Sequence, residues 1–277
     1  MTTRLGATTK GRLIVFLVAV WFGQTVCADI IFTAPPRENQ QKAEEIYGPI
    51  AEQLSEILGE TVVYKKPTGW FDYSNRMRAG EYDIVFDGPH FAAWRVKHLK
   101  HIPVASLPGR LRFVVIVKKD DDGIKSVRDL AGVKVCSMLS PFLGTNLIYD
   151  MIDNPVLQPI IHEVGGGMKG VYQAFRKGEC RAALLRDIMF NKLPKEQQSA
   201  IKVLQATTAL PNQTITVSQR LQKNAQQIAD FMLSQEGVIA ADGLLKQYSG
   251  KEKRFEPASA AQYDGVERLL EGVVWGW

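Results

Sequence analysis

The stretch MRAGEYDIVFDGPHF, residues 77–91, carries the pattern that decides the fold. Gly80 is placed to end a helix, and Asp83–Phe86 is a run typical of a buried strand. A second helix is expected from Phe91 onward, directly after the turn at Gly88. A helix, a buried strand and a helix in such close succession indicate βαβ units, and therefore a largely parallel sheet covered by helices.

The residues before this stretch repeat the alternation. Strands are expected over Asp29–Thr33 and Thr61–Tyr64, which are rich in β-branched and aromatic residues. The apolar stripe between them predicts a helix with Pro49 in its first turn and Gly59 as its C-cap. Asp72 is expected to cap the following helix.

A second unit follows Pro108, and the sheet-forming pattern is interrupted again near Pro211. The remaining elements are strands over Phe113–Lys118, Val133–Met138, Ala182–Leu185 and Thr214–Val217, a capping box at Ser126–Asp129, and helices over Leu147–Ile152, Val171–Arg176, Ala225–Ser234, Val238–Tyr248 and near Tyr263–Gly272. We therefore expect two α/β lobes. Residues 29–110 form the first, to which 212–277 return in part, and residues 111–211 form the second. The two chain crossings would act as a hinge, with the cleft between the lobes as the ligand site.

The first 28 residues predict an export signal. Two basic residues precede the apolar run Leu13–Phe22, which is shorter than the roughly 20 residues of a bilayer span. Val26-Cys27-Ala28 places small residues before Asp29, as at a signal-peptidase site. We expect cleavage after Ala28; the alternatives are an uncleaved anchor, a buried helix, or a lipid on Cys27, which the preceding residues disfavour.

Composition excludes several classes of protein. Of the 277 residues 45% are apolar and 23% are charged, so wholesale disorder is excluded. The formal net charge is +5, and removal of residues 1–28 takes away three of the 34 basic residues and none of the 29 acidic ones. The balance that remains gives no support for nucleic-acid binding. No later stretch is apolar for long enough to span a membrane, so we expect a soluble, exported protein.

Cleavage would leave two cysteines, Cys136 and Cys180. An even pair in an oxidising compartment permits one disulfide. Cys136 lies late in one expected strand and Cys180 lies before another, and these are opposite ends if the strands run parallel. Spacing alone leaves open a disulfide or two buried thiols.

Five short segments, in their order along the chain, resemble one known family. They are residues 47–54 (YGPIAEQL), 77–89, 117–132, 174–179 (AFRKGE) and 210–220. The chain resembles the phosphate, phosphite and phosphonate type of solute-binding proteins of ABC transporters, which have the type II periplasmic-binding-protein fold. The resemblance covers nearly all of the chain after residue 28. It implies a periplasmic, monomeric protein, without a cofactor, that delivers a small ligand to the transmembrane subunits of a permease.

The resemblance also implies ligand-binding positions. Trp70 stands at an aromatic position of the family cleft that is often Tyr, and Gly88-Pro89 matches the family turn after the third strand. The family's oxyanion loop, a Pro followed by a Ser-Thr-Ser-Gly run, aligns with Pro141–Asn146, which keeps only the proline and Thr145. Met168 falls at the position of a phosphonate-contacting His. These losses predict weak binding of simple alkylphosphonates and tighter binding of a larger organic solute.

The loop Ser140–Asn146 joins an expected strand to an expected helix, whose first N–H groups favour an anion. Gly144 would let the backbone approach the ligand closely. The alternative is that Thr145 or Asn146 only caps the helix. Trp70 would stack on the ligand, or else pack in the core.

Charged and titratable residues near the ends of the expected strands are further candidates. Asp87 and His90 would hydrogen-bond a polar or cationic ligand, and His90 would make binding pH-sensitive. Alternatively, Asp87 caps the next helix and His90 is solvated. Arg37, Arg112 and Arg186 are candidate contacts for an anion, or surface charges.

Other motifs in the sequence give little evidence for a metal, phosphate or catalytic site. His98 and His101 share a helix face, but no cysteine or paired carboxylate joins them, so we expect two solvated histidines and no metal. Gly165-Gly166-Gly167 lacks the Lys-Ser/Thr of a phosphate-binding loop and is interpreted as a flexible turn. Because no Gly-x-Ser-x-Gly elbow or nucleophilic Cys–His pair occurs, we expect no enzymatic activity.

Two functions fit these expectations. The first is capture of a small anionic or polar organic ligand and its delivery to an ABC permease. The alternative is a periplasmic sensory module that reports ligand occupancy to a signalling partner, because the same fold serves both.

Overall fold

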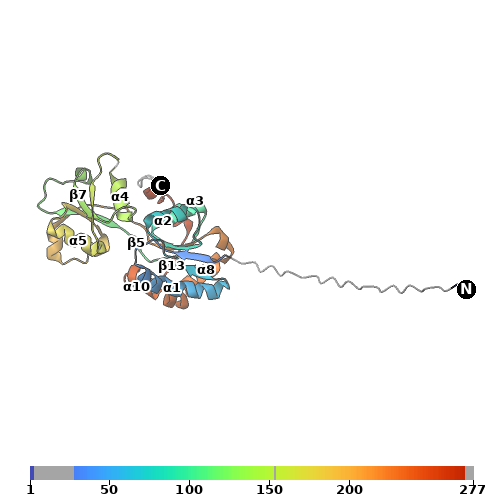
Figure 1. Cartoon of the computed structure of the whole chain (residues 1–277). Helices are drawn as coiled ribbons and strands as arrows, with labels where there is room; N and C mark the ends of the chain where they lie inside the picture. The colour runs from blue at the N-terminus through green and yellow to red at the C-terminus, as the bar shows by residue number, and fades with distance from the viewer. Residues whose placement is uncertain (3–27, 153, 272–277) are drawn as a thin grey trace.

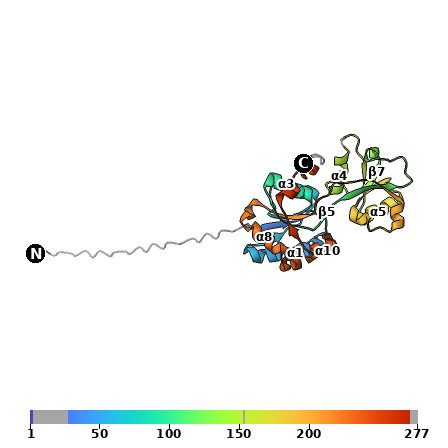
Figure 2. The same ribbon diagram turned by 180° about the vertical axis from the view of Figure 1, so that it is seen from behind.

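The computed structural model describes residues 1–2, 28–152 and 154–271, so most of the expected signal peptide lies outside it. From residue 28 onward the chain forms two α/β lobes joined by a narrow ribbon, which Figures 1 and 2 show from opposite sides. The predicted two-lobed fold is thereby confirmed. Among the described residues, no helix is long and apolar enough to cross a membrane.

The first lobe is built on a six-stranded sheet with the order β13-β4-β12-β3-β1-β2. The strands β1, β2 and β3 pair in parallel, whereas β12, β4 and β13 add antiparallel pairs. Their bounds are β1 (Ile30–Thr33), β2 (Val62–Tyr64), β3 (Ile84–Asp87), β4 (Ile102–Ser106), β12 (Thr214–Val217) and β13 (Glu256–Pro257).

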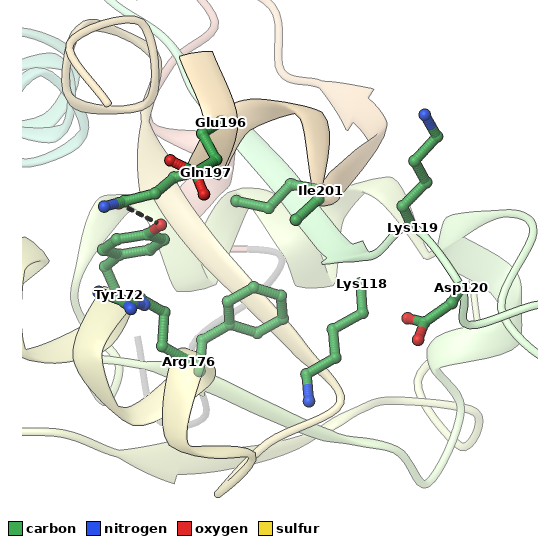
Figure 3. Close-up of a pocket in the computed structure, with 10 residues that line it drawn as sticks. Lys118, Lys119, Asp120, Tyr172, Arg176, Glu196, Gln197 and Ile201 are labelled. Atoms are coloured by element: carbon green, nitrogen blue, oxygen red, sulfur yellow. Dashed lines mark hydrogen bonds between the residues drawn. The ribbon is translucent and has the colours of Figure 1, made fainter. Parts of the chain in front are cut away.

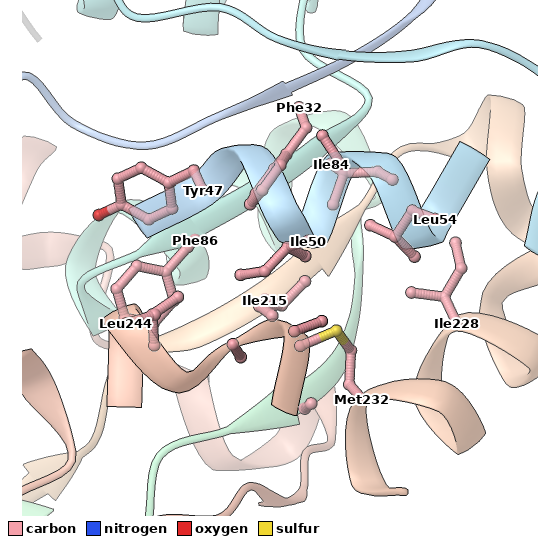
Figure 4. Packing of buried hydrophobic residues seen from close by; sticks show 14 of the residues in the cluster. Phe32, Tyr47, Ile50, Leu54, Ile84, Phe86, Ile215, Ile228, Met232 and Leu244 are labelled. Carbon is pink, nitrogen blue, oxygen red and sulfur yellow. The ribbon is translucent and has the colours of Figure 1, made fainter. Parts of the chain in front are cut away.

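Helices cover both faces of this sheet. They are α1 (Gln40–Leu58), α2 (Trp70–Arg78), α3 (Pro89–Leu99), α8 (Ala225–Leu233), α9 (Gln235–Ala240) and α10 (Asp242–Tyr248), with the 3₁₀ turn η2 (Gln219–Asn224). On one face α1, α8 and α10 enclose the larger core, in which Phe32, Ile50 and Met232 are fully buried (Figure 4). On the other face, α2 and α3 pack around Tyr73 and Phe91.

The second lobe is built on a five-stranded sheet with the order β10-β6-β9-β7-β8. Its strands are β6 (Phe113–Lys118), β7 (Lys134–Ser137), β8 (Ile160–Glu163), β9 (Ala182–Arg186) and β10 (Ile201–Ala206). Its helices are η1 (Val127–Leu130), α4 (Leu143–Met151), α5 (Gly167–Lys177), α6 (Asp187–Phe190) and α7 (Lys195–Ser199). The apolar residues of α4 and α5 belong to different core clusters of this lobe.

The ribbon between the lobes is the antiparallel pair β5 (Arg110–Leu111) and β11 (Leu210–Pro211). After β13 the chain does not stay within the first lobe. It forms η3 (Ala260–Tyr263) and α11 (Arg268–Glu271), and α11 contacts both α3 of the first lobe and α4 of the second.

Two expected helix starts in the first lobe are wrong. The helix α1 begins at Gln40 and contains Pro49 in its interior, because the buried stripe continues on the N-terminal side of the proline. Burial of that stripe outweighs the single helical hydrogen bond that the proline removes. The helix α2 begins at Trp70, so Asp72 lies within its first turn rather than at the cap.

Both sheets are mixed rather than mainly parallel, because β12 and β6 follow the chain crossings and run back against their neighbours. Four strands, β4, β8, β10 and β13, are not among those expected from the sequence. Pro103 argues against a strand at β4, and β8 is an edge strand with partly exposed side chains. The Ser126 capping box, β6, β12 and the C-cap at Gly59 are confirmed.

Cys136 and Cys180 form a disulfide. The strands that contain Cys136 and follow Cys180 are parallel, as assumed, but Cys180 lies in the turn between α5 and β9. This turn brings the chain back over the face of the sheet to which α5 packs, and both cysteines are buried in that cluster. The two cysteines can therefore meet, although one lies within a strand and the other lies before the start of the neighbouring strand.

Loss of this disulfide should destabilise the second lobe. The crosslink spans 44 residues, so its removal increases the entropy of the unfolded chain by an amount worth about 2–4 kcal/mol. Urea unfolding of Cys136→Ala/Cys180→Ala against the oxidised wild type measures this difference. An unchanged midpoint would contradict the prediction.

Candidate ligand site between the lobes

A buried ion pair closes the end of β3. Asp87 Oδ2 accepts a 2.8 Å hydrogen bond from Arg95 Nε, and the Tyr73 hydroxyl donates to Asp87 Oδ1. Both charged side chains are fully buried, and the Arg95 guanidinium lies 5.6 Å from the Tyr73 ring centroid and 5.5 Å from that of Tyr82. Asp87 is therefore not the cap of α3. Its carboxylate holds the β3–α3 turn in place through the pair with Arg95 of α3.

The N-terminus of α3 faces the second lobe. Gly88 is the N-cap, Pro89 is the first helical residue, and no side chain caps the helix. His90 is only 3% exposed, so the alternative of a solvated histidine is wrong. Its Nε2 lies 2.9 Å from the carbonyl oxygen of Pro141 in the second lobe. Among the described residues, His90 Nδ1 has no hydrogen-bond partner.

The environment of His90 sets its protonation. Burial lowers the pKa of His90 to about 3; the hydrogen bond to the Pro141 carbonyl opposes this, and the positive charge of Arg37 reinforces it. The imidazole is therefore neutral near pH 7. Because Nε2 must donate to the carbonyl, Nδ1 carries the lone pair and is a buried acceptor.

Arg37 follows β1 and reaches the same turn. Its Nη1 donates a 2.9 Å hydrogen bond to Gln213 Oε1, and its guanidinium lies 5.6 Å from the Tyr248 ring centroid. Its Nη2 lies 3.8 Å from the point where a Cβ on Gly88 would stand. Desolvation opposes the charge of Arg37, but Tyr248 and neighbouring phenol and carboxylate groups outweigh it and raise the pKa.

Trp70 begins α2 at the same edge of the lobe. Its ring is stacked on Phe91 with centroids 6.0 Å apart and meets Tyr73 edge-on at 6.1 Å. The residue is nevertheless 38% exposed. Trp70 therefore packs on one side and presents apolar surface on the other.

In the second lobe, the loop after β7 is more structural than expected. The helix α4 begins at Leu143, before both expected caps, and no side chain caps it. The buried hydroxyl of Thr145 donates to the Met138 carbonyl and bonds Ser137 Oγ at 2.7 Å. A Cβ on Gly144 would clash with the Leu184 side chain, so this glycine provides room for core packing rather than for a ligand.

Ser140 and Asn146 tie this loop to the rest of the molecule. Ser140 Oγ donates to Asn146 Oδ1 at 2.9 Å, and the buried Asn146 Nδ2 donates to the Leu269 carbonyl at 2.9 Å. Asn146 is therefore engaged on both sides, with the loop and with the C-terminal part of the chain.

Arg186 is the last residue of β9, in the middle of the second sheet. Its guanidinium lies 5.7 Å from the Phe113 ring centroid, and its buried Nε has no partner among the described residues. Burial lowers the pKa of Arg186, while the adjacent Asp187 acts in the opposite direction. Arg112 is exposed, and Met168 is half-buried against both core clusters of the lobe.

These contacts form a continuous path across the junction. Arg37 approaches Gly88, His90 contacts Pro141, and the neighbouring Phe142 meets Phe113 edge-on at 5.6 Å, beneath Arg186. Neither Arg37 nor Arg186 forms an ion pair with any described carboxylate. Guanidinium groups from both lobes, neither with an ion-pair partner among the described residues, thus approach one junction.

Sequence reasoning missed three residues of this region. Gln213 accepts from Arg37, Arg95 neutralises Asp87, and Phe113 lies beneath Arg186. Their signals were weak, because a Gln before a strand or a lone Arg within a helix is usually exposed.

His98 and His101 have different surroundings in the structure. His98 is exposed and contacts Glu271, whereas His101 is buried and bonds Thr216 Oγ1 at 3.1 Å, so the expectation that both are solvated is wrong for His101. Among the described residues, no group of three His, Cys, Asp or Glu side chains could hold a metal ion.

An open hollow of about 830 Å³ lies at the other end of the second lobe (Figure 3). Lys118, Arg176 and Glu196 are among the residues that line it, with Tyr172 hydrogen-bonded to Gln197 at 2.8 Å. Cations and carboxylates are mixed in its lining, and it begins where β6 ends, away from the junction.

Buried neutral histidines make stability depend on pH. The pKa of His90 and of His101 is lowered to about 3 in the folded protein, against about 6.5 in an unfolded chain. Between about pH 6.5 and pH 3, the unfolded chain therefore binds more protons than the folded protein. Stability should be full above about pH 6.5 and fall below it, by up to ~1.4 kcal/mol per pH unit for each histidine.

His90→Gln tests this, because glutamine keeps a donor for the Pro141 carbonyl but does not titrate in this range. Urea unfolding at about pH 7 and about pH 5 should show a weaker pH dependence than wild type. The exposed Arg128→Gln is the control and should retain the full dependence. An equal change in the free energy of unfolding between the two pH values in His90→Gln and wild type would contradict the lowered pKa of His90.

Comparison with known proteins agrees with this architecture. The sequence model of a family described as "ABC transporter, phosphonate, periplasmic substrate-binding protein" matches residues 32–263. The phosphate-import protein PhnD of Mycolicibacterium smegmatis is 25% identical over 186 residues, which cover 59% of this chain. The match spans only 56% of the length of that relative.

Solved structures share the fold. A Xanthomonas citri protein bound to ATP has a TM-score of 0.67 at 12% identity, over 89% of this chain and 97% of the other. PhnD1 from Prochlorococcus marinus, in complex with methylphosphonate, has a TM-score of 0.60 at 16% identity, over 88% and 97%. A binding protein of a phosphonate transporter from Pseudomonas aeruginosa has a TM-score of 0.57 at 17% identity, over 87% and 85%.

The family match covers both lobes and the ribbon between them, and these structures repeat the architecture at low identity. The chain belongs to the family of phosphonate-type periplasmic substrate-binding proteins of ABC transporters.

Proposed function

We propose that this protein is an extracytoplasmic solute-binding protein that captures a small organic anion between its lobes and delivers it to an ABC permease. The observation that carries the proposal is the approach of Arg37 and Arg186, each without a carboxylate partner among the described residues, to one junction. Guanidinium groups form strong, charge-assisted hydrogen bonds with oxyanions. An anion bound by both would draw the lobes together.

The ligand site that we propose has two layers. Arg37, Trp70, Gly88 and His90 would contact the ligand from the first lobe, and Ser140, Met168, Arg112 and Arg186 from the second. Behind them, Asp87, Gly144, Thr145 and Asn146 shape the site through packing and hydrogen bonds.

The remaining expectations belong to the same proposal. The lobes, residues 29–110 with 212–277 and residues 111–211, would rotate about β5 and β11. The mature chain would begin at Asp29, act in the periplasm as a monomer without a cofactor, and have no enzymatic activity. The comparisons give no support to the sensory alternative.

The ligand should be larger than a simple alkylphosphonate. The loop after β7 lacks two family hydroxyls, and the one that remains, on Thr145, is used within the loop. Each missing donor to a buried oxygen costs about 1–3 kcal/mol. The exposed side of Trp70 offers apolar surface to an organic body.

Calorimetry with methylphosphonate, aminoethylphosphonate and phenylphosphonate tests this. We expect weak binding of the first two and about tenfold tighter binding of phenylphosphonate, since an aromatic contact adds roughly 0.5–1.5 kcal/mol. Trp70→Ala should remove this preference, whereas Phe71→Ala should keep it, because Phe71 is 79% exposed. Submicromolar affinity for methyl- or aminoethylphosphonate would show that the lost hydroxyls do not decide the ligand.

The anion site itself is tested by Arg37→Gln and Arg186→Gln. Each should weaken phenylphosphonate about tenfold or more, since a charge-assisted bond contributes roughly 1.5–3 kcal/mol. Arg128→Gln, an exposed arginine on η1, is the matched control. If a thermal-shift panel of phosphonates, phosphates, sulfonates and carboxylates gives no stabilisation of the wild type, the proposed function is wrong.

A further inference from the structure

The C-terminal part of the chain makes a third connection between the lobes, in addition to β5 and β11. We propose that residues Ala260–Glu271 are a strap that holds the two lobes together in the ligand-free protein and positions the loop after β7. The inference concerns the lobes themselves, so it does not rest on the proposed function.

The strap is anchored to the first lobe by apolar and ionic contacts. Leu270 is fully buried in the cluster of Tyr73 and Phe91 beneath α2 and α3. Lys97 of α3 bonds Glu267 at 3.1 Å and Glu271 at 3.0 Å. The strap thus turns one face to α3.

Its other face belongs to the second lobe. Tyr263, Val266 and Leu269 are buried in the cluster that contains Leu147 and Ile148 of α4. This cluster also includes Ala92 and Ala93 of α3, so one apolar core runs from the first lobe through the strap into the second. Rotation of the lobes has to shear this core.

Polar contacts make the connection specific. Asn146 Nδ2 donates to the Leu269 carbonyl at 2.9 Å, and Arg268 pairs with Asp150 at the end of α4. Near the ribbon, the Tyr263 hydroxyl donates to the Asn212 carbonyl at 3.3 Å. The strap therefore runs from the ribbon along both helices (Figure 2).

Through Asn146 the strap reaches the proposed ligand site. Asn146 Oδ1 accepts a hydrogen bond from Ser140, and Asn146 Nδ2 donates one to the Leu269 carbonyl of the strap. Pro141, which follows Ser140 in the chain, contacts His90 across the junction. Asn146 is thus a positioning residue. A strap that moves would carry the loop after β7 with it.

The test uses ligand-free protein and the variant Asn146→Asp/Arg268→Ala. Aspartate keeps the acceptor for Ser140 but loses the donor to Leu269, and the second change removes the pair with Asp150. Small-angle scattering should show a larger radius of gyration than in wild type. Hydrogen exchange should become about tenfold or more faster in α11 and at the start of α4, with α1 unchanged.

Two controls separate the strap from general stability. Arg181→Ala breaks an exposed ion pair within the second lobe, with Asp121, and should change neither measurement at the junction. Asn146→Gln/Arg268→Lys keeps the donor and the charge and should restore slow exchange in part. A wild-type radius and exchange in the first variant, or equal loss of protection in α1, would overturn the proposal.

Discussion

The arrangement of the junction depends on the buried ion pair between Asp87 and Arg95. Asp87 ends β3, and Arg95 lies in the second turn of α3, so the pair fixes how the helix leaves the sheet. Both charges are fully removed from solvent, and loss of one partner from such a pair typically costs about 3–5 kcal/mol. The Tyr73 hydroxyl also accepts a 3.1 Å hydrogen bond from Arg95 Nη2, and tyrosine rings flank the guanidinium, although the buried Arg95 Nη1 has no hydrogen-bond partner among the described residues. Gly88 and His90 lie in the chain between these two paired residues, so the pair restrains their position.

From this fixed turn, two kinds of contact cross to the second lobe. His90 contributes a neutral donor to Pro141, which its low pKa permits. The apolar residues of α3 contribute a surface that the C-terminal segment joins to α4. The junction therefore combines a specific polar contact with a larger apolar one, and Arg37 and Arg186 approach it without an ion-pair partner among the described residues.

The loop after β7 illustrates how a family position changes its role. Gly144 and Thr145 occupy an oxyanion loop in the resemblance, but here Gly144 makes room for Leu184 and Thr145 bonds within the loop. Asn146 similarly faces the C-terminal segment rather than open space. The scaffold of the family is retained, while the groups that offer positive charge at the junction are arginines from both lobes.

The sequence alone determined the elements whose signals are local. The strand over Phe113–Lys118, the capping box at Ser126 and the C-cap at Gly59 follow from hydrophobic period, cap residues and glycine, which act within one segment. The two lobes were indicated by the interruptions of the sheet-forming pattern near Pro108 and Pro211. The start of α1 does not follow, because burial of a long stripe overrides the local preference of Pro49.

Only the tertiary structure decided the roles of the polar residues. Asp87 is a buried partner because Arg95 reaches it, His90 is neutral because the second lobe covers it, and Cys180 reaches Cys136 because a turn crosses the sheet face. Each outcome depends on a group far away in the sequence or on the other lobe. Burial and pairing are properties of the assembled core, so a pattern within one segment cannot specify them.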